Sequence, residues 1–366
     1  MFLMKKLFSP VLRMYSSNST FTTNDVIFEM INNVGIITLN RPKVLNSLNE
    51  DMVRCIYAQL KEWERKCSFV IVKGSGDKAF CAGGDVVTAT SDKEKGKSFF
   101  RNEYKMNYLI AMYKRPYISI CDGITMGGGV GISVHGPYRI ATEKTLFAMP
   151  ETQIGLFPDV GGSYFLPRLN EKLGLFLGLS GYRLQGSDTV KAGIATHYIY
   201  SENVPKLIEK LLEVDPARIG EFLGTYSVDI SQKSFSLQPY LHIINSCFYA
   251  DTVEEICSLL WRDGSFWAKG VADVIMKQSP TSLKITKQEL EIGARQNLRE
   301  CLKTEFRLAC AALDKKVTSD FYEGVRALLV DKDKSPKWKP DHLEDVTEGM
   351  IDKCFEPLSQ SEELDI

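Results

Sequence analysis

The feature that most constrains this chain is a glycine-rich turn followed closely by two carboxylates. Gly127, Gly128 and Gly129 stand side by side before the apolar run VGISV, and Glu151 and Asp159 follow a short distance downstream. Glycines let a backbone approach a ligand with no Cβ in the way, and a helix that begins there presents free N–H groups to developing negative charge. The pattern predicts an anion-stabilising backbone site with proton-transfer or nucleophilic groups beside it.

A second glycine turn, FCAGGD at residues 80–85, follows the β-rich run SFVIVKGSG. Taken alone, a glycine pair usually marks a tight connection. The two turns together are more informative, because each follows an apolar β-run and each leads into a predicted helix. Such turns can direct two backbone N–H donors at one oxygen, which is the geometry of an oxyanion hole.

The first two hundred residues alternate between strand and helix patterns. Residues 26–42 predict two strands around an Asn-Asn-Val-Gly turn, and residues 47–66 have helical spacing with Asn49 as a plausible cap. The same order of strand, helix and strand returns around the glycines at 127–129. We therefore expect an α/β core over residues 25–200, built from repeated sheet and helix units.

The sequence pattern changes after residue 200, from alternating strands and helices to helices alone. Residues 201–330 are mostly amphipathic helical segments, with glycine and proline confined to their ends. From Asp331 the sequence DKDKSPKWKPDHLEDV is charged and contains proline, which predicts an extended surface segment. We expect residues 201–366 to form a helical C-terminal region packed on or beside the core.

Composition excludes several classes of function. Lysine and arginine total 45 against 46 acidic residues, a formal net charge of −1, so nothing attracts a polyanion such as nucleic acid over the whole chain. The nine cysteines are scattered without a CxxC pair, which indicates reduced thiols and neither a zinc site nor a disulfide framework. No segment has the roughly 18 to 20 consecutive apolar residues of a membrane span.

The N-terminal segment before Asp25 contains basic residues and serines but no acidic residue. This composition resembles a mitochondrial transit peptide, whereas a secretory signal needs an unbroken apolar run that Pro10 and Arg13 interrupt here. The plainer alternative is a disordered basic tail. We expect a transit peptide over residues 1–20 and a location in the mitochondrial matrix.

The common nucleotide and hydrolase motifs do not fit. GGGVG fails the pattern GxGxxG, EKGKSFF has Ser91 in place of the first P-loop glycine, and no GxSxG elbow is present. His135 is a possible base, but a lone histidine after an apolar run is more often a structural hydrogen-bonder. For Cys81 we favour packing of a small residue.

Glu151 and Asp159 each follow a proline in an apolar setting, MPE and FPD. Apolar neighbours raise the pKa of a carboxyl group toward the range useful for acid/base catalysis. In isolation, Glu151 would more simply cap a helix and Asp159 would more simply be a turn residue.

The segments FCAGGD, GITMGGGVGISVHG and FAMPETQIGLFPDVGGSYFLPRL closely resemble the crotonase (enoyl-CoA hydratase/isomerase) superfamily. The resemblance extends through NRPKVLNSLN, AGIATHYI, SPTSLKIT and DFYEGVRALLVDKDKSPKWKP, and so covers nearly all of the chain after the leader. It implies an α/β fold, a crotonase-like spiral of repeated ββα units whose two roughly perpendicular sheets are surrounded by helices. It also implies an acyl-CoA bound past the two glycine turns.

The resemblance assigns roles to individual positions. Gly84 and Gly128 match the oxyanion-hole donors, and Glu103, Glu151 and Asp159 match the acyl-pocket carboxylates of the hydrolase branch. Coenzyme A is part of the substrate, so neither a separate cofactor nor a metal ion is implied. We add Lys332 and Lys337 as candidates for contacting the nucleotide phosphates of CoA, although a solvated charged surface is the simpler reading of each lysine.

One position separates the branches of the superfamily. A hydratase carries a glutamate three residues after the middle glycine, where this chain has Gly131. The resemblance therefore implies hydrolysis of the thioester of 3-hydroxyisobutyryl-CoA, and of 3-hydroxypropionyl-CoA, in valine catabolism. The alternatives are an enoyl-CoA hydratase or isomerase and a non-catalytic structural subunit of a mitochondrial assembly. The oligomeric state, including a homo-oligomer, stays open.

Overall fold

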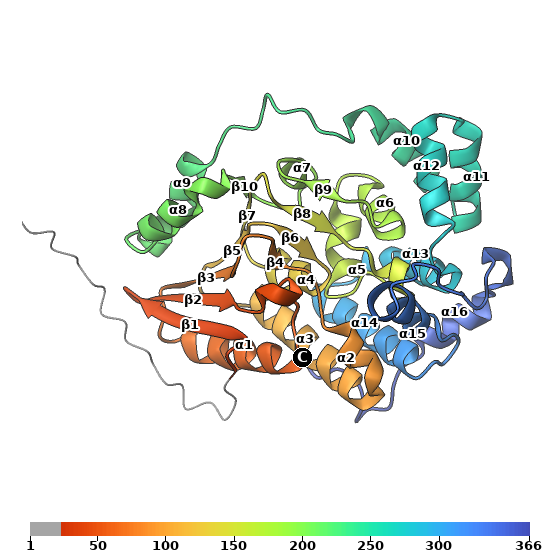
Figure 1. The fold of residues 1–366 in the computed structure, drawn as a ribbon, viewed down its shortest axis with the longest axis horizontal. Coiled ribbons are helices and arrows are strands. Elements are labelled where there is room, and N and C mark those ends of the chain that lie inside the picture. Colours follow the sequence, from red (N-terminus) through yellow and green to blue (C-terminus); the bar gives the residue numbers. More distant parts are fainter. Residues whose placement is uncertain (1–22) are drawn as a thin grey trace, which may run out of the picture.

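The computed structural model describes residues 23–366 (Figure 1). The transit peptide predicted at residues 1–20 lies outside the described residues. Two β-sheets occupy the middle of the molecule, and helices surround them (Figure 1). The α/β fold predicted from the sequence is confirmed.

The larger sheet has six strands in the order β1-β2-β3-β5-β7-β10, and the smaller has four in the order β4-β6-β8-β9. All neighbouring strands pair in parallel except β1 with β2 and β8 with β9. The strands of the larger sheet are β1 (Val26–Ile31), β2 (Val34–Leu39), β3 (Phe69–Gly74), β5 (Tyr117–Cys121), β7 (Tyr138–Ala141) and β10 (His197–Tyr198). Those of the smaller sheet are β4 (Ala79–Cys81), β6 (Ile124–Met126), β8 (Leu146–Ala148) and β9 (Leu184–Gln185).

Consecutive strands alternate between the two sheets. In each of the pairs β3/β4, β5/β6 and β7/β8, the first strand joins the larger sheet and the second joins the smaller one. Helices follow the strand pairs, as the expected ββα repeat requires. The hairpin β1/β2 is followed by α1 (Glu50–Trp63), and the three alternating pairs are followed by α2 (Val86–Ser91), α3 (Lys93–Ala111), α4 (Gly128–Val134) and α5 (Gly162–Phe165).

Short-range sequence signals explain the turn between β1 and β2 and the start of α1. The turn between β1 and β2 consists of Asn32 and Asn33, and both have positive φ, at 49° and 66°. This is the two-residue hairpin loop that asparagine tolerates best after glycine. The side chain of Asn49 accepts a hydrogen bond from the N–H of Met52, so the cap predicted for α1 is confirmed.

Helices dominate the chain after α5. They are α6 (Leu173–Ser180), α7 (Asp188–Lys191), α8 (Val204–Leu211), α9 (Ile219–Tyr226), α10 (Leu241–Phe248), α11 (Val253–Asp263), α12 (Phe266–Ile275), α13 (Pro280–Gly293), α14 (Leu298–Leu313), α15 (Asp320–Val325) and α16 (Glu348–Phe355). A π-helical turn, η7 (Arg326–Val330), follows α15. Short 3-10 turns are η1 (Pro42–Val44), η2 (Glu151–Ile154), η3 (Leu166–Arg168), η4 (Ser201–Asn203), η5 (Pro216–Arg218), η6 (Gln238–Tyr240) and η8 (Leu343–Asp345).

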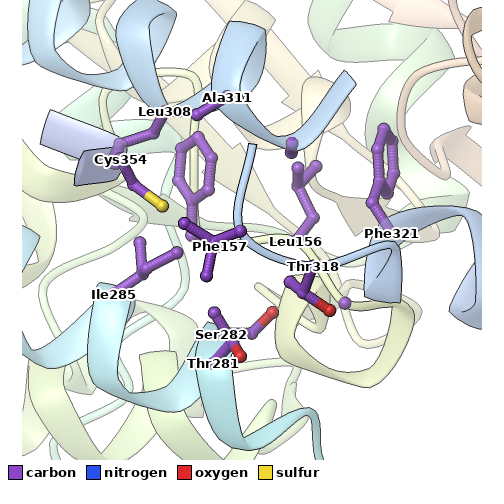
Figure 2. Close-up of a pocket in the computed structure, with 13 residues that line it drawn as sticks. Leu156, Phe157, Thr281, Ser282, Ile285, Leu308, Ala311, Thr318, Phe321 and Cys354 are labelled. Atoms are coloured by element: carbon purple, nitrogen blue, oxygen red, sulfur yellow. The ribbon is translucent and has the colours of Figure 1, made fainter. Parts of the chain in front are cut away.

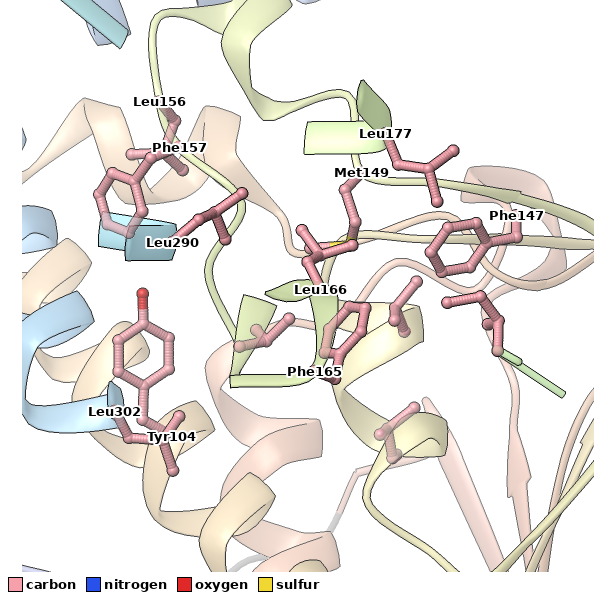
Figure 3. Close-up of a cluster of buried hydrophobic side chains, with 14 of the residues drawn as sticks. Tyr104, Phe147, Met149, Leu156, Phe157, Phe165, Leu166, Leu177, Leu290 and Leu302 are labelled. Carbon is pink, nitrogen blue, oxygen red and sulfur yellow. The ribbon is translucent and has the colours of Figure 1, made fainter. Parts of the chain in front are cut away.

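These helices use two different surfaces of the core. Helices α8 and α9 pack their apolar residues on the larger sheet, in a cluster that includes Phe69, Ile118 and Leu207. Helices α13 and α14 join the main core, and Figure 3 shows Leu290 and Leu302 beside Tyr104 and Phe157. The segment from Asp331 to residue 342 has neither helix nor strand, as predicted, whereas η8 and α16 that follow it were not predicted.

Candidate active site

The candidate site lies at the carboxyl ends of three neighbouring parallel strands. β4, β6 and β8 are adjacent in the smaller sheet, with Cys81 opposite Thr125 and Met126 opposite Ala148. Because parallel strands end at the same edge, the segments that follow them converge there. Those segments carry the two glycine turns and Glu151.

A backbone ladder orients the first glycine turn. The N–H of Leu48 donates to the carbonyl of Gly83 at 2.9 Å, and the N–H of Asp85 donates to the carbonyl of Leu48 at 2.7 Å. In a parallel pairing of this kind, the residue between the two bonded neighbours points its own N–H to the opposite side. The N–H of Gly84 therefore faces away from Leu48.

The second turn places another free N–H beside the first. Gly128 is the first residue of α4, so its N–H has no partner within the helix. A Cβ on Gly128 would lie 3.2 Å from the nitrogen of Gly84, which puts the two amides next to each other. The preceding residues, Gly83 with φ 123° and Gly127 with φ 47°, adopt backbone conformations that favour glycine.

Both turns open into one cavity of about 340 Å³, within the size range of small-molecule sites. Its polar lining includes the carboxylates of Glu103, Glu151 and Asp159, and its apolar walls come from both halves of the chain. The apolar and small lining residues include Leu45, Ala82, Val86, Phe99, Phe100, Met126, Ile154, Leu156, Leu328 and Leu329. All five site residues assigned by the resemblance therefore meet in one place.

Glu151 lies directly beside the second turn. It begins η2 after Pro150, is only 5% exposed, and has one oxygen, Oε1, 2.9 Å from where a Cβ on Gly127 would stand. Its other oxygen, Oε2, has no hydrogen-bond partner among residues 23–366. Burial, reinforced by the nearby carboxylate of Asp159, holds the pKa of Glu151 well above its ordinary value.

Glu103 and Asp159 complete the carboxylate group from different elements. Helix α3 supplies Glu103, whose Oε1 would collide with a Cβ on Gly128. The loop before α5 supplies Asp159, whose Oδ2 accepts a hydrogen bond from the hydroxyl of Tyr104 at 2.8 Å. Burial raises the pKa of Asp159 to about 7, and burial together with Asp159 raises the pKa of Glu103 well above its ordinary value.

The three carboxyl groups disfavour one another's ionisation. They lie in one buried site, and none of them forms an ion pair within residues 23–366. Neighbouring carboxylates without a cation share protons, because each negative charge disfavours the next. The site thus combines backbone donors for an oxyanion with carboxyl groups able to hold or release a proton near neutral pH.

The sequence of this chain matches a known protein family whose members act on acyl-CoA compounds, as the description of its family model indicates. A model of the family described as "Enoyl-CoA hydratase/isomerase" matches residues 34–355. The chain belongs to this family.

Curated relatives of the family share about half of the sequence. The chain is 50% identical over 358 residues to the human protein named "3-hydroxyisobutyryl-CoA hydrolase, mitochondrial", covering 94% of this chain and 92% of that one. It is 49% identical over 349 residues to the protein of the same name from Danio rerio, covering 92% and 91%.

Solved structures of the family are similar in fold. A carnitinyl-CoA dehydratase from Mycobacterium thermoresistibile has a TM-score of 0.87 at 35% identity, covering 94% of this chain and 99% of that one. An enoyl-CoA hydratase from Rhodobacter sphaeroides 2.4.1 has a TM-score of 0.84 at 32% identity, covering 93% and 100%. The fold is therefore shared with proteins titled as a dehydratase and a hydratase, so the fold alone does not distinguish these activities from hydrolysis.

The C-terminal helices support the segment that carries Glu151 and Asp159. The carboxylate of Glu305 on α14 accepts hydrogen bonds from the N–H groups of Gly161 at 2.7 Å and of Ser163 at 3.0 Å. A small cavity behind the same segment, lined by Leu156 and Phe157 together with residues of α13, α14, α15 and α16, is shown in Figure 2. Leu156 lines both this cavity and the site itself.

His135 and Cys81 have structural surroundings, as their sequence contexts suggested. A ring nitrogen of His135, Nε2, lies 2.8 Å from the carbonyl oxygen of Val160, and burial lowers the pKa of this histidine to about 4. The thiol of Cys81 donates to the carbonyl of Gly83 at 3.6 Å, and burial raises its pKa to about 12. Neither residue lines the cavity.

The two candidate lysines lie in the loop after η7, whose Leu328 and Leu329 line the cavity. Both lysines are exposed, and the backbone N–H of Lys337 donates to Glu323 at 2.8 Å. Contact of Lys332 and Lys337 with CoA stays a prediction. Arg183, an exposed residue that also lines the cavity, was not predicted, because no pattern in the sequence singles it out.

The described part of the chain has neither a metal-binding cluster nor a helix suited to a membrane. Among residues 23–366, no cluster of three or more histidine, cysteine or acidic side chains has a geometry that could hold a metal ion. Within the same residues, none of the helices combines the length and apolar character that crossing a membrane requires.

Proposed function

We propose that this chain hydrolyses the thioester of 3-hydroxyisobutyryl-CoA to the free hydroxy acid and coenzyme A. The observation that carries this proposal is a paired backbone donor site with Glu151 beside it and no second acid/base glutamate at position 131. The names of the curated relatives support the same reaction and a place for it in the mitochondrion. A role of this reaction in valine catabolism is part of the proposal.

Position 131 argues against the hydratase alternative. A Cβ on Gly131 would lie 2.6 Å from Cβ of Val160 and 2.9 Å from Nδ2 of Asn107, so a glutamate has no room there. Addition of water to a C=C bond in this family uses two glutamates, and this chain offers only the position of Glu151. The same site residues argue against a purely structural subunit, since a scaffold has no need of buried, unpaired carboxylates.

In the proposed reaction, the thioester oxygen accepts hydrogen bonds from the N–H groups of Gly84 and Gly128. Each donor contributes about a hundredfold to a thousandfold to the rate, because it stabilises the negative charge that develops on that oxygen. Glu151 either attacks the carbonyl carbon or removes a proton from a water molecule that attacks it. In both routes the tetrahedral intermediate collapses with cleavage of the C–S bond, and CoA leaves as a thiolate whose conjugate acid has a pKa of roughly 8.5, so it needs little help from an acid. The first route leaves a mixed anhydride, which water hydrolyses to the hydroxy acid and the free Glu151 carboxylate, whereas the second gives the hydroxy acid directly.

The remaining carboxylates account for the substrate class. Asp159, with Glu103, accepts a hydrogen bond from the 3-hydroxyl of the acyl chain. A site built to bond a hydroxyl rejects an analogue without it, because the buried polar group is then left unpaired. The 3-hydroxypropionyl thioester keeps this hydroxyl and lacks only a methyl group, so it is accepted as well. CoA is part of the substrate, and no separate cofactor takes part.

The test is a comparison of two reactions on protein that begins at residue 21. Release of CoA from 3-hydroxyisobutyryl-CoA is followed with a thiol reagent, and hydration of crotonyl-CoA is followed by the loss of enoyl absorbance. We expect rapid thiol release and negligible hydration, with thiol release lost in Glu151→Gln. The exposed Glu209→Gln on α8 is the matched control and keeps full activity. Hydration without thiol release would overturn the proposal.

A further inference from the structure

The buried hydrogen bond between Tyr104 and Asp159 has no role in the reaction as described so far. The hydroxyl of Tyr104 donates to Oδ2 of Asp159 at 2.8 Å, and the two residues are 0% and 4% exposed. Tyr104 directly follows Glu103 on α3, but its ring enters the core. Figure 3 shows its hydroxyl pointing toward Leu290 and Phe157. The bond therefore joins the rigid core to one wall of the site.

Tyr104 is held more firmly than its partner. Its ring lies 5.9 Å from the ring of Phe100 and 6.4 Å from the ring of Phe306, the latter in an edge-to-face arrangement. Asp159 lies in a loop and precedes Val160, a β-branched residue with φ 52°. A positive φ is unfavourable for such a residue, so surrounding contacts have to maintain the loop conformation. The tyrosine is thus the fixed partner that determines where the carboxylate points.

The bond also decides which oxygen remains for a ligand. Oδ2 is occupied by Tyr104, and no other residue within residues 23–366 donates a hydrogen bond to Oδ1. Asp159 lines the cavity. An ionised Asp159 is an acceptor only, so it selects a ligand group that can donate a hydrogen bond, such as a hydroxyl.

We propose that Tyr104 is the positioning residue that gives Asp159 its specificity for a 3-hydroxyl group. This inference rests on the proposed function, since it concerns how the same site chooses among acyl thioesters. Tyr104 does not line the cavity and acts only through Asp159. An ordinary core tyrosine would contribute to stability without affecting the choice between two substrates.

The charges around Asp159 show why a donor is needed there. The ionisable groups that interact with Asp159 from the packed elements are acidic, apart from Tyr104 itself: Glu103 on α3, Glu151 on η2, Glu289 on α13 and Glu305 on α14. The hydrogen bond from Tyr104 lowers the pKa of Asp159, opposing the effect of burial. Without the hydroxyl, Asp159 holds its proton to higher pH and becomes a poorer acceptor.

Tyr104→Phe tests this inference by removing a single oxygen atom. The readout is the ratio of kcat/KM for 3-hydroxyisobutyryl-CoA to kcat/KM for isobutyryl-CoA, which lacks the hydroxyl. We expect this ratio to fall about tenfold to a hundredfold, as for loss of a hydrogen bond to a charged group. The acid limb of the pH profile for the hydroxylated substrate should also move to higher pH.

The design separates specificity from folding. Both substrates are measured on one preparation, so the ratio does not depend on the fraction of folded enzyme. Tyr113→Phe is the control, because the hydroxyl of Tyr113 donates to the carbonyl of Leu60 at 2.9 Å and lies outside the site. Equal losses with both substrates in Tyr104→Phe would make Tyr104 purely structural and overturn the inference.

Asp159→Asn provides a second test in which Tyr104 stays in place. If Tyr104 donates to the amide oxygen, the amide NH₂ faces the substrate and offers a donor instead of an acceptor. Acetoacetyl-CoA, whose 3-oxo group only accepts, should then gain at least tenfold relative to 3-hydroxybutyryl-CoA, and adding Tyr104→Phe should abolish the gain. No gain would contradict the inference alone, whereas absence of thioester hydrolysis in the unmodified enzyme would overturn the proposed function and this inference together.

Discussion

Replacing Gly128 with alanine tests the oxyanion site with the smallest possible change. The added Cβ would lie 3.2 Å from the nitrogen of Gly84 and 3.4 Å from the carbonyl carbon of Gly83, and it would collide with Oε1 of Glu103. An oxyanion has to sit about 2.7–3.1 Å from its donors. The methyl group therefore competes with the thioester oxygen for the space in front of the Gly84 amide.

The expected loss follows from the number of donors affected. If the methyl group removes one of the two hydrogen bonds, kcat/KM falls about a hundredfold to a thousandfold, which corresponds to about 2.7–4 kcal/mol of transition-state stabilisation. The loss should appear in kcat, because the oxyanion forms only as the reaction proceeds. The fold should survive, since Glu103 is the end of a side chain and can rotate away.

The assay is steady-state release of CoA from 3-hydroxyisobutyryl-CoA, with a thermal melt of the same preparation. Gly270→Ala on α12 is the matched control, because a Cβ there meets nothing within 4 Å. Alanine in the interior of a helix is more favourable than glycine by about 1 kcal/mol, so this control should melt slightly higher and keep full turnover. Turnover of Gly128→Ala within tenfold of the unmodified enzyme would refute the assignment of the Gly84 and Gly128 amides.

Two further predictions concern buried positions near the site. Gly131→Glu should not create hydration of crotonyl-CoA and should lower the melting temperature, because Val160 and Asn107 fill the space beside position 131; a folded variant that hydrates crotonyl-CoA would contradict this. Glu289→Gln should make the free energy of unfolding less dependent on pH. Both carboxylate oxygens of Glu289 are buried without a partner among the described residues, and burial raises the pKa of Glu289 well above 4.5. The folded state then binds a proton that the unfolded state releases, so stability falls by about 1.4 kcal/mol per pH unit from pH 4.5 up to the raised pKa. Urea unfolding of both proteins at pH 5 and pH 8 measures the difference, and an equal pH dependence would rule out this origin.

Local patterns in the sequence predicted much of the fold. The hairpin turn and the cap of α1 depend on a few neighbouring residues, and asparagine supplies both, at Asn32 and Asn33 and at Asn49. The glycine turns were recognisable for the same reason, since a positive φ before each donor requires glycine. The sequence did not predict which strands join which sheet, because β4, β6 and β8 have only three residues each.

The groups that hold the site in place could not be predicted. Tyr104 and Glu305 lie on long helices whose own patterns indicate only a buried face. Their partners, Asp159 and Gly161, are distant in the sequence and come close only when α3 and α14 pack against the loop before α5. The sequence offered one indirect signal for Tyr104, which is its position next to Glu103. It offered none for Glu305, because charged side chains are usually exposed and a buried glutamate is not expected.

The burial of the cysteines has a consequence for redox chemistry. All nine thiols are buried, and those nearest the glycine turns, Cys81 and Cys121, have pKa values raised by burial to about 12 and about 11. Thiol–disulfide exchange requires an accessible thiolate, which these residues do not provide. The proposed reaction releases coenzyme A, itself a thiol, into a cavity that none of these cysteines lines. A CoA disulfide would therefore find no accessible thiolate on the walls of the site, so no mixed disulfide between CoA and the protein forms there.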